Sequence, residues 1–162
     1  MTAEKEAEAR GDFQVATNRR ALHDYFVEQT IECGIVLTGT EVKSLRQGKA
    51  QLADSYAMVD RGEVYLLHLH ISPYAQGNRA NHEPMRQRKL LLHKKEIDRL
   101  WAKSRTKGYA LVPLRLYFKR GKAKVALGVC KGKQVHDKRH TIAERDAKRE
   151  MDRAKRGEER GR

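Results

Sequence analysis

Two Arg-Gly pairs, Arg61-Gly62 and Arg120-Gly121, restrict the fold of this chain more than any other feature. The first lies between SYAMVD and EVYLLHLHIS, and the second between YALVPLRLYF and KAKVALGVC. Each of these runs is short and rich in apolar residues, which predicts a β-strand. A two-residue connection that ends in glycine predicts a tight hairpin turn. The sequence therefore predicts two antiparallel hairpins.

Other segments add further strands. The stretch from Leu22 to Leu37 is rich in β-branched residues and predicts one long strand, in which Gly34 indicates a bulge or bend. RKLLLH predicts a short strand or the lead into a helix. There is no βαβ alternation, and closing the sheet removes exposed edges. We therefore expect a mainly β fold, a small antiparallel OB-like β-barrel with two or three short helices.

The helices are predicted by side-chain spacing. Thr40 can cap a short helix over residues 41–47, which Gly48 ends. Ile97, Leu100 and Trp101 share one helical face, so a second helix is expected to run up to Gly108.

Composition divides the 162 residues into three segments. We expect a disordered leader over residues 1–16, a barrel over 17–130 and a basic C-terminal tail over 131–162, where the apolar periodicity stops. The leader is polar and acidic, which is typical of neither a signal peptide nor a transit peptide. One domain is expected for this length.

The net charge of +14 is concentrated in the predicted barrel. Residues 17–130 carry 21 basic and 10 acidic side chains, and the tail carries 12 and 7. A folded part this basic repels itself unless a polyanion is a regular partner. Nucleic acid is the first candidate and an anionic membrane surface the second. No stretch approaches the ~18–20 apolar residues of a membrane span.

The tail favours a helix but has no continuous apolar stripe. Thr141 and Glu144 fit a capping box, and Ala, Glu, Lys and Arg dominate the residues that follow. An isolated helix of ~15 residues is marginal in water. We therefore expect the tail to be disordered when free and helical when a partner holds it.

Catalysis has little support in the sequence. No nucleophile elbow, phosphate-binding glycine loop or paired zinc motif is present. His68 and His70 would share one face of a strand and could hold a metal, but no third potential ligand lies at a sequence spacing typical of metal sites. Cys33 and Cys130 match no metal spacing and indicate a reducing cytosol. We expect no enzyme activity, no metal and no cofactor.

Basic and aromatic residues are interleaved in two stretches, which favours RNA binding. Lysine and arginine neutralise phosphates, and rings stack on exposed bases. A structural role for Phe26 and Phe118 remains the favoured alternative for those two rings. No recognition helix for a DNA major groove is visible. The two stretches hold Arg19, Arg20, His23, Tyr25 and Phe26, and then Tyr117, Phe118, Lys119, Arg120, Lys122 and Lys124.

These residues also carry a family resemblance. The segments NRRALHDYFVEQTIECGIVLTGTEVKSLRQGKA, DSYAMV, HISPY, QGNRANHEP, RKLLLH, GYALVPLRLYF and KGKQVHDKR resemble the SmpB family, the SsrA-binding proteins of bacteria. The likeness covers about residues 17–156. TGTEVKSLR, RKLLLH and HDKR in this order are highly specific together.

The resemblance implies a function. It implies an OB-like barrel that binds the tRNA-like domain of transfer-messenger RNA (tmRNA, SsrA RNA) and delivers it, with elongation factor Tu, to stalled ribosomes for trans-translation. It also implies a tail that becomes helical in the decoding centre and the empty message channel, against 16S-type ribosomal RNA. A cytoplasmic protein, monomeric when free and without a membrane partner, is expected.

The resemblance also implies which residues contact tmRNA. Glu32 could accept a hydrogen bond from a base edge or 2′-hydroxyl, or form a salt bridge to a nearby arginine. Leu91 could face RNA or the core, and the sequence alone favours the core. Leu22 stands where the family usually has arginine. The expected tmRNA contacts are Asn18, Arg19, Arg20, His23, Tyr25, Glu32, Tyr56, Leu91, Lys122 and Lys124.

In the tail, the resemblance implies contacts with the ribosome. A ring at His136 can stack on a ribosomal base, and Lys138 and Arg139 can hold phosphate. The expected set is Lys131, Gly132, Lys133, His136, Asp137, Lys138 and Arg139. The alternative is a ribosomal or ribosome-assembly protein that binds ribosomal RNA through the barrel and the tail.

Overall fold

The computed structural model describes residues 11–160, apart from the side chains of residues 135, 136 and 158–160. Its strands are β1 (Phe13–Thr17), β2 (Tyr25–Ile35), β3 (Ala50–Gln51), β4 (Tyr56–Asp60), β5 (Glu63–Leu67), β6 (His70–Ile71), β7 (Arg88–Leu91), β8 (Tyr109–Lys119) and β9 (Lys122–Gly132). Its helices are α2 (Arg19–Asp24), α3 (Gly39–Arg46), α4 (Lys94–Ser104), α5 (Val135–Arg160) and the 3-10 turn η1 (Asn78–Ala80).

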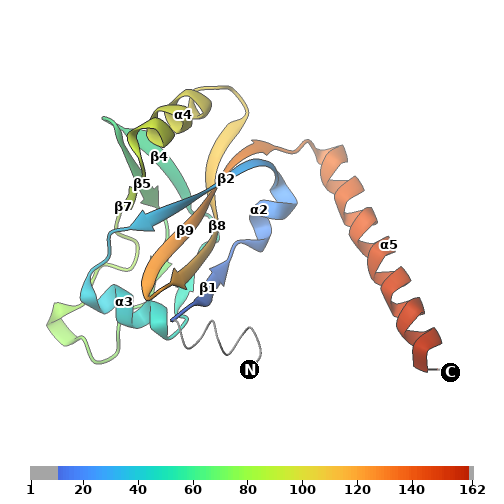
Figure 1. Ribbon diagram of the computed structural model, residues 1–162, viewed down its shortest axis with the longest axis horizontal. Coiled ribbons are helices and arrows are strands. Elements are labelled where there is room, and N and C mark those ends of the chain that lie inside the picture. Colours follow the sequence, from blue (N-terminus) through green and yellow to red (C-terminus); the bar gives the residue numbers. More distant parts are fainter. Residues whose placement is uncertain (1–10, 161–162) are drawn as a thin grey trace.

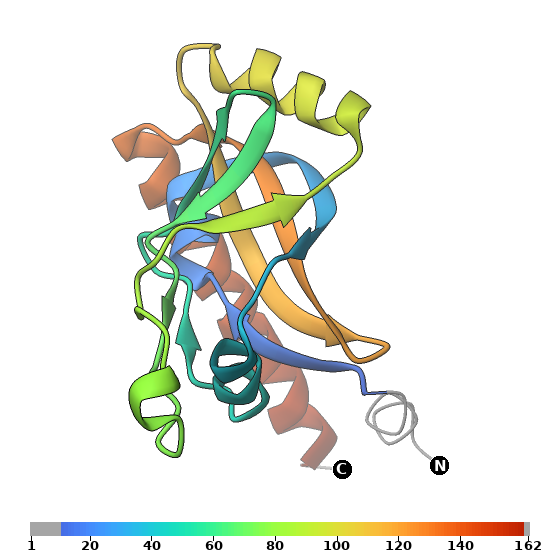
Figure 2. The same ribbon diagram turned by 90° about the vertical axis from the view of Figure 1, so that its left-hand side faces the viewer.

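Six strands form a ring that closes on itself (Figures 1 and 2). Strand β8 pairs with β4, and the order continues through β5, β7, β2 and β9, which pairs with β8 again. Every pairing is antiparallel, and β1 adds to β8 outside the ring. The prediction of an antiparallel, nearly closed sheet with inserted helices is confirmed at this level.

Both hairpin predictions are also confirmed. Arg61 and Gly62 have φ angles of 50° and 76°, and Arg120 and Gly121 have 51° and 75°. Two consecutive residues in the left-handed region form the turn that matches the right-handed twist of the flanking strands. Glycine has no Cβ and adopts this conformation without strain, which explains its place in each pair.

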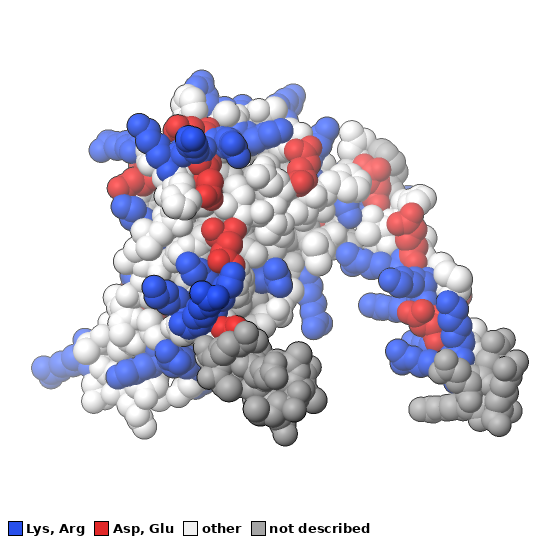
Figure 3. All heavy atoms as spheres, viewed as in Figure 1, with Lys and Arg blue, Asp and Glu red and all other residues white. Residues whose placement is uncertain are grey.

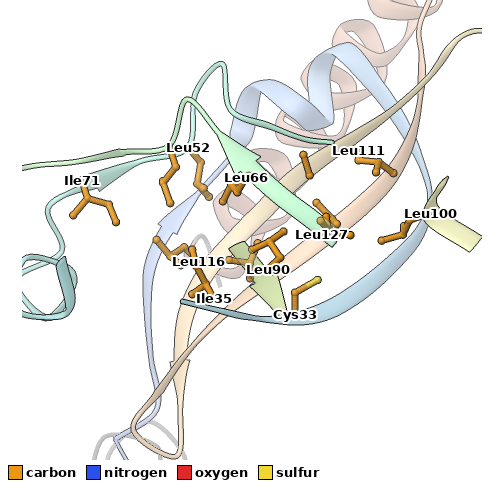
Figure 4. Packing of buried hydrophobic residues seen from close by; sticks show 14 of the residues in the cluster. Cys33, Ile35, Leu52, Leu66, Ile71, Leu90, Leu100, Leu111, Leu116 and Leu127 are labelled. Carbon is orange, nitrogen blue, oxygen red and sulfur yellow. The ribbon is translucent and has the colours of Figure 1, made fainter. Parts of the chain in front are cut away.

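Aliphatic side chains fill the ring (Figure 4). Leu66, Leu90, Leu116 and Leu127 are at most 1% exposed and come from four different strands. Leu100 of α4 joins the same cluster, so α4 covers part of the ring. Shortening one of these leucines to alanine costs about 2–5 kcal/mol, because the cavity cannot fully collapse.

The strand expected from Leu22 to Leu37 is partly wrong. Residues Arg19–Asp24 form α2, and the strand begins at Tyr25. The reason is Asn18, whose side-chain oxygen accepts a hydrogen bond from the Ala21 amide at 3.1 Å and so starts a helix. Gly34 pairs without a register shift, and the bulge in β2 lies between Val27 and Gln29.

Gly34 is needed for a close approach instead of a bulge. A Cβ atom on Gly34 would lie 3.1 Å from the Cβ of Leu91 on the neighbouring strand β7. A larger residue at this position would therefore require the Leu91 side chain to shift by a few tenths of an ångström.

The predicted helix positions shift by a few residues. Helix α3 begins at Gly39 and not at 41, because the Thr38 amide donates to the Glu41 carboxylate at 2.8 Å. Thr40 therefore does not cap it. Helix α4 ends at Ser104, four residues before Gly108.

The segment boundaries also need correction. Residues 13–16 belong to β1, which pairs with β8, so they are not part of a disordered leader. Residues 1–10 lie outside the described part of the chain. Strand β9 continues to Gly132, so the barrel ends two residues later than expected.

Residues Val135–Arg160 of the tail form one continuous helix, α5, which projects away from the barrel (Figure 1). It begins six residues before the predicted capping box, so that box is wrong. The Thr141 hydroxyl instead donates to the Asp137 carbonyl at 2.9 Å inside the helix. Asp137 in the first turn accepts from the Gln134 amide at 3.3 Å, which favours a helix start here. Among the described residues, no helix is long and apolar enough to cross a membrane.

Candidate nucleic-acid interface

The first group of expected RNA contacts lies where β7, β2 and β9 run side by side. Gly34 of β2 is paired with Leu91 of β7 on one side and with Lys124 of β9 on the other. Glu32 lies two residues before Gly34 on the same strand and so on the same face. We call Glu32, Leu91 and Lys124, with Tyr117 and Lys119 of β8, the barrel face.

Glu32 is held by neighbours of β8. The Tyr117 hydroxyl donates to the Glu32 carboxylate at 2.5 Å, and the Lys119 ammonium lies 3.4 Å away. The Tyr117 hydrogen bond, followed by Lys119, lowers the pKa of Glu32. Burial and Glu32 raise the pKa of Tyr117 to about 12. At neutral pH the carboxylate is therefore charged and the phenol keeps its proton.

The salt-bridge alternative for Glu32 is thus partly right, because the cation is a lysine and not an arginine. The side chain is still 41% exposed, which leaves room to accept a further hydrogen bond. Arg115 lies over the Tyr117 ring at 5.6 Å, and the sequence analysis missed it. Alternation along β8 would have found it, since residues 115, 117 and 119 share one face.

The preference for a core role of Leu91 is wrong. Its side chain is 52% exposed, because it ends β7 on the outer side of the ring and leans on Gly34. Lys122, also expected to contact RNA, is exposed at the start of β9 beside the Arg120-Gly121 turn.

The second group surrounds α2. Arg20 is 67% exposed and lies 3.2 Å from Asp54, and the His23 ring nitrogen lies 2.7 Å from Asp24. Tyr25 and Tyr56 line a groove of about 610 Å³ between α2, β4 and β8. Arg19, Arg20, His23, Tyr25 and Tyr56 are called the α2 cluster below.

Asn18 belongs to the framework of the α2 cluster and not to its surface. It is 5% exposed, caps α2, and donates to the Pro113 carbonyl at 3.0 Å. An RNA contact through this buried amide would break both interactions.

The two groups lie at opposite ends of β2. Tyr25 is the first residue of the strand and pairs with Gly132, whereas Gly34 near its end pairs with Lys124. Nine residues of strand at ~3.3 Å each span up to about 30 Å. The exposed residues expected to contact tmRNA therefore fall into two surface groups, toward opposite ends of β2.

The tail begins beside the α2 cluster. The Lys133 amide donates to the Asp24 carbonyl at 2.9 Å, and the Lys138 ammonium lies 3.4 Å from the Asp24 carboxylate. The His23 hydrogen bond, followed by Lys138, lowers the pKa of Asp24, so its negative charge persists at neutral pH. The Lys133 ammonium also lies 4.8 Å from the centre of the Phe26 ring.

Leu22 contributes its backbone to this junction. Its carbonyl accepts from Lys133 at 3.2 Å and from Arg145 at 3.4 Å, while its side chain is 45% exposed. The α2 cluster and the base of the tail therefore form one continuous surface.

The expected ribosome contacts lie around this junction. Lys131 and Gly132 end β9, and the Gly132 amide donates to the Gly108 carbonyl at 3.0 Å. Asp137 and Lys138 are half-buried in the first turns of α5, and Arg139 is exposed. The side chain of His136 lies outside the described part of the structure.

His68 and His70 do not share one continuous strand, as the sequence analysis expected. The strand EVYLLHLHIS breaks at His68, whose φ of 62° lies in the left-handed region, so β5 ends at Leu67 and β6 begins at His70. His68 instead lies against the Tyr56 ring at 5.4 Å. The described residues contain no group of three or more potential metal ligands.

Both cysteines are buried, Cys33 in the core of the ring and Cys130 in a separate cluster with Ala21 of α2 and Val112 of β8. Burial raises the pKa of Cys33 to about 12 and that of Cys130 to about 11. Neither is therefore a reactive thiolate at neutral pH.

Positive charge covers much of the visible surface (Figure 3). Lysine and arginine side chains gather over α4 and along α5, with only scattered acidic side chains between them. Positive charge next to exposed tyrosines is the combination that nucleic-acid surfaces use.

The chain is similar to known proteins over most of its length. The family model described as "SmpB protein" matches residues 15–157. The SsrA-binding protein of Desulforudis audaxviator is 61% identical over 143 residues, which cover 88% of this chain and 94% of that protein. The SsrA-binding protein of Symbiobacterium thermophilum is 60% identical over 153 residues, covering 93% and 97%.

A solved structure agrees with this likeness. The chain described as "tmRNA-SmpB: a journey to the center of the bacterial ribosome" is 52% identical and superposes with a TM-score of 0.64. The match covers 77% of the present chain and 86% of the solved one.

Proposed function

Because this chain belongs to the SmpB protein family, we propose that it is a non-enzymatic RNA-binding adaptor that binds tmRNA and brings it to stalled ribosomes for trans-translation. We propose that one surface binds tmRNA and the other contacts the ribosome, because the two surfaces lie toward opposite ends of β2. An adaptor must hold its cargo and its destination at the same time, and two distant surfaces make this possible.

The barrel face binds the tRNA-like domain of tmRNA. Lys124 and Lys119 supply charge for phosphates, and Leu91 supplies exposed apolar surface for a base or ribose. Glu32 accepts a hydrogen bond from a base edge or a 2′-hydroxyl. Its persistent negative charge makes it selective against a phosphate at that point.

We propose that the α2 cluster, whose residues the family resemblance assigns to tmRNA, faces the ribosome instead, together with the tail. They form one surface through Asp24, and this surface lies far from Lys124 along β2 and β9. In this proposal Lys131, Lys133, Lys138 and Arg139 hold phosphates of 16S-type ribosomal RNA, Asp137 orients its basic neighbours, and His136 stacks on a base of the decoding centre. The distal part of α5 lines the empty message channel.

Several finer points belong to the same proposal. The ring is an OB-like barrel, elongation factor Tu joins the delivery complex, and the protein acts in the bacterial cytoplasm as a monomer when free. Helix α5 forms on the ribosome and is disordered in the free protein, since it lacks an apolar stripe. A free-protein NMR spectrum with rigid amide signals beyond residue 140 would contradict the last point.

A pull-down with sequencing of the bound RNA tests the function. The tagged protein is captured from bacterial lysate, and all co-purified RNA is sequenced. One dominant small RNA with a tRNA-like end is expected. Stoichiometric ribosomal RNA without such a species would overturn the proposal and favour a ribosomal or ribosome-assembly protein.

A further inference from the structure

A second, smaller hollow lies between α4 and the ring, outside both surfaces described so far. It measures about 350 Å³, a volume at the lower end of the range of small-ligand sites. Its floor contains the buried side chains of Leu100 and Val129. Gln29, Arg99, Lys103 and Thr106 also line it. An apolar floor with a polar and basic rim fits a flat, polar-edged molecule.

The polar groups of the rim differ in how many hydrogen-bond donors and acceptors they have unused. The side-chain amide of Gln29 has no hydrogen-bond partner among the described residues. The Thr106 hydroxyl donates to the Ala102 carbonyl at 3.2 Å and keeps its acceptor capacity. The bulge between Val27 and Gln29 shifts the register of β2 next to this hollow. Bulges commonly re-aim side chains next to functional sites.

Glu28, the residue inside the bulge, positions Lys103, which lines the hollow. The Tyr109 hydroxyl donates to its carboxylate at 2.6 Å, and Lys103 lies 3.5 Å from it. The Lys103 ammonium also lies 4.7 Å from the centre of the Tyr109 ring. This basic group is therefore positioned at the rim before any ligand arrives.

The charge around the hollow selects the class of ligand. Between Lys94 and Lys107 the chain has six basic and two acidic side chains. The net positive charge disfavours a basic partner, and the two-residue apolar floor is too small for the face of a protein helix. A base with a neighbouring phosphate matches the shape, the free amide and the charge.

We propose that the α4 hollow binds one unpaired nucleotide of RNA, which adds a third contact to the proposed function and depends on it. The base lies on Leu100 and Val129, its edge meets the Gln29 amide, and Arg99 and Lys103 hold the flanking phosphates. Because every base has a flat face, the hollow tolerates different sequences but needs an unstacked base.

The test uses the full chain, labelled with ¹⁵N and titrated with hexaadenylate, hexauridylate or a fully paired RNA hairpin. The single-stranded probes are expected to shift the Gln29 side-chain amide and the Thr106 backbone amide, and the hairpin is not. Ala102→Phe, which fills the hollow without changing charge, and Gln29→Ala are each expected to weaken hexanucleotide binding about three- to tenfold. Ala75→Phe, an exposed loop position far from α4, is the matched control.

Affinity for the tRNA-like domain of tmRNA is measured with the same proteins. If the unaltered chain does not bind that domain, the proposed function fails. If it binds, but neither variant weakens hexanucleotide binding more than Ala75→Phe does, the hollow proposal alone fails. Equal shifts with the hairpin would show charge attraction without base binding and would also overturn the proposal.

Discussion

Some charged residues of this chain stabilise the fold and others are available to bind a partner, and the two kinds differ in burial. Glu41 and Arg88 are completely buried and paired with each other, and Arg86 also binds Glu41. Arg88 further donates to the carbonyls of Leu69 at 2.6 Å and Pro84 at 3.1 Å. Lys124 lies on the outer face of β9. The first group holds α3 against β7, and residues such as Lys124 remain available for a partner.

Lys124→Ala tests the barrel face. The substitution is expected to weaken tmRNA binding and to lower the slope of log affinity against log salt by about one unit, because one phosphate contact disappears. The measurement is a filter-binding series at several salt concentrations. Lys49→Ala, which removes an exposed lysine that follows α3, is the control. An unchanged slope would remove Lys124 from the interface.

Glu41→Gln tests the buried network. Removing one partner leaves the Arg88 guanidinium buried without a counter-charge, so the free energy of unfolding is expected to fall by about 3–5 kcal/mol. Glu63→Gln, which breaks the half-exposed pair with Lys89, should cost less than about 1 kcal/mol. Urea unfolding of both variants measures the difference. Equal losses would contradict this account.

The same network predicts a pH dependence. Burial alone would raise the pKa of Glu41, but hydrogen bonds from Arg86, the Thr38 amide and Arg88 outweigh it and lower that pKa below its ordinary 4.5. The stabilisation is therefore complete above pH 4.5 and is lost as the pH falls through the folded-state pKa. The stability gap between the unaltered chain and Glu41→Gln should narrow only below that pH. If the difference in the free energy of unfolding between the two proteins narrows between pH 7 and pH 5, the titration of Glu41 is not its cause.

At the scale of elements, helices and strands could be predicted where residues close in sequence determine them. The two hairpins follow from Arg-Gly turns, and α4 follows from the spacing of Ile97, Leu100 and Trp101. Helix α2 could not be predicted in this way, because its cap residue Asn18 also depends on Pro113, which lies 95 residues away in sequence. The start of α5 was predicted too late because Asp137, and not Thr141, occupies its first turn.

His136→Ala tests the first turn of α5. The substitution is expected to impair tagging of stalled chains strongly while the circular dichroism spectrum of the barrel stays unchanged, since stacking on a ribosomal base is lost. A ribosome-coupled tagging assay gives the readout. His140→Ala, on the same helix where His140 lies 3.1 Å from Glu144, is the control and should tag normally. Normal tagging by His136→Ala would exclude the stacking role.

At the scale of the molecule, the sequence names candidate contact residues but does not show how the fold divides them into two surface groups. That division depends on the register of β2 with β9, which places Lys124 opposite Gly34 and Gly132 opposite Tyr25. Periodicity does not determine which residues of two distant strands become partners. The pairing of β2 with β7 likewise places the small Gly34 beside Leu91, whose side chain is exposed.

Because the two surfaces are separate, tmRNA binding should not require the part that acts on the ribosome. One deletion tests this most directly. Removing residues 135–162 leaves β9 and the Lys133 contact with Asp24 intact. The account predicts that the truncated protein binds tmRNA with an affinity close to that of the full chain and supports no tagging on stalled ribosomes. Loss of tmRNA binding by the truncated protein, or normal tagging by it, would contradict the account.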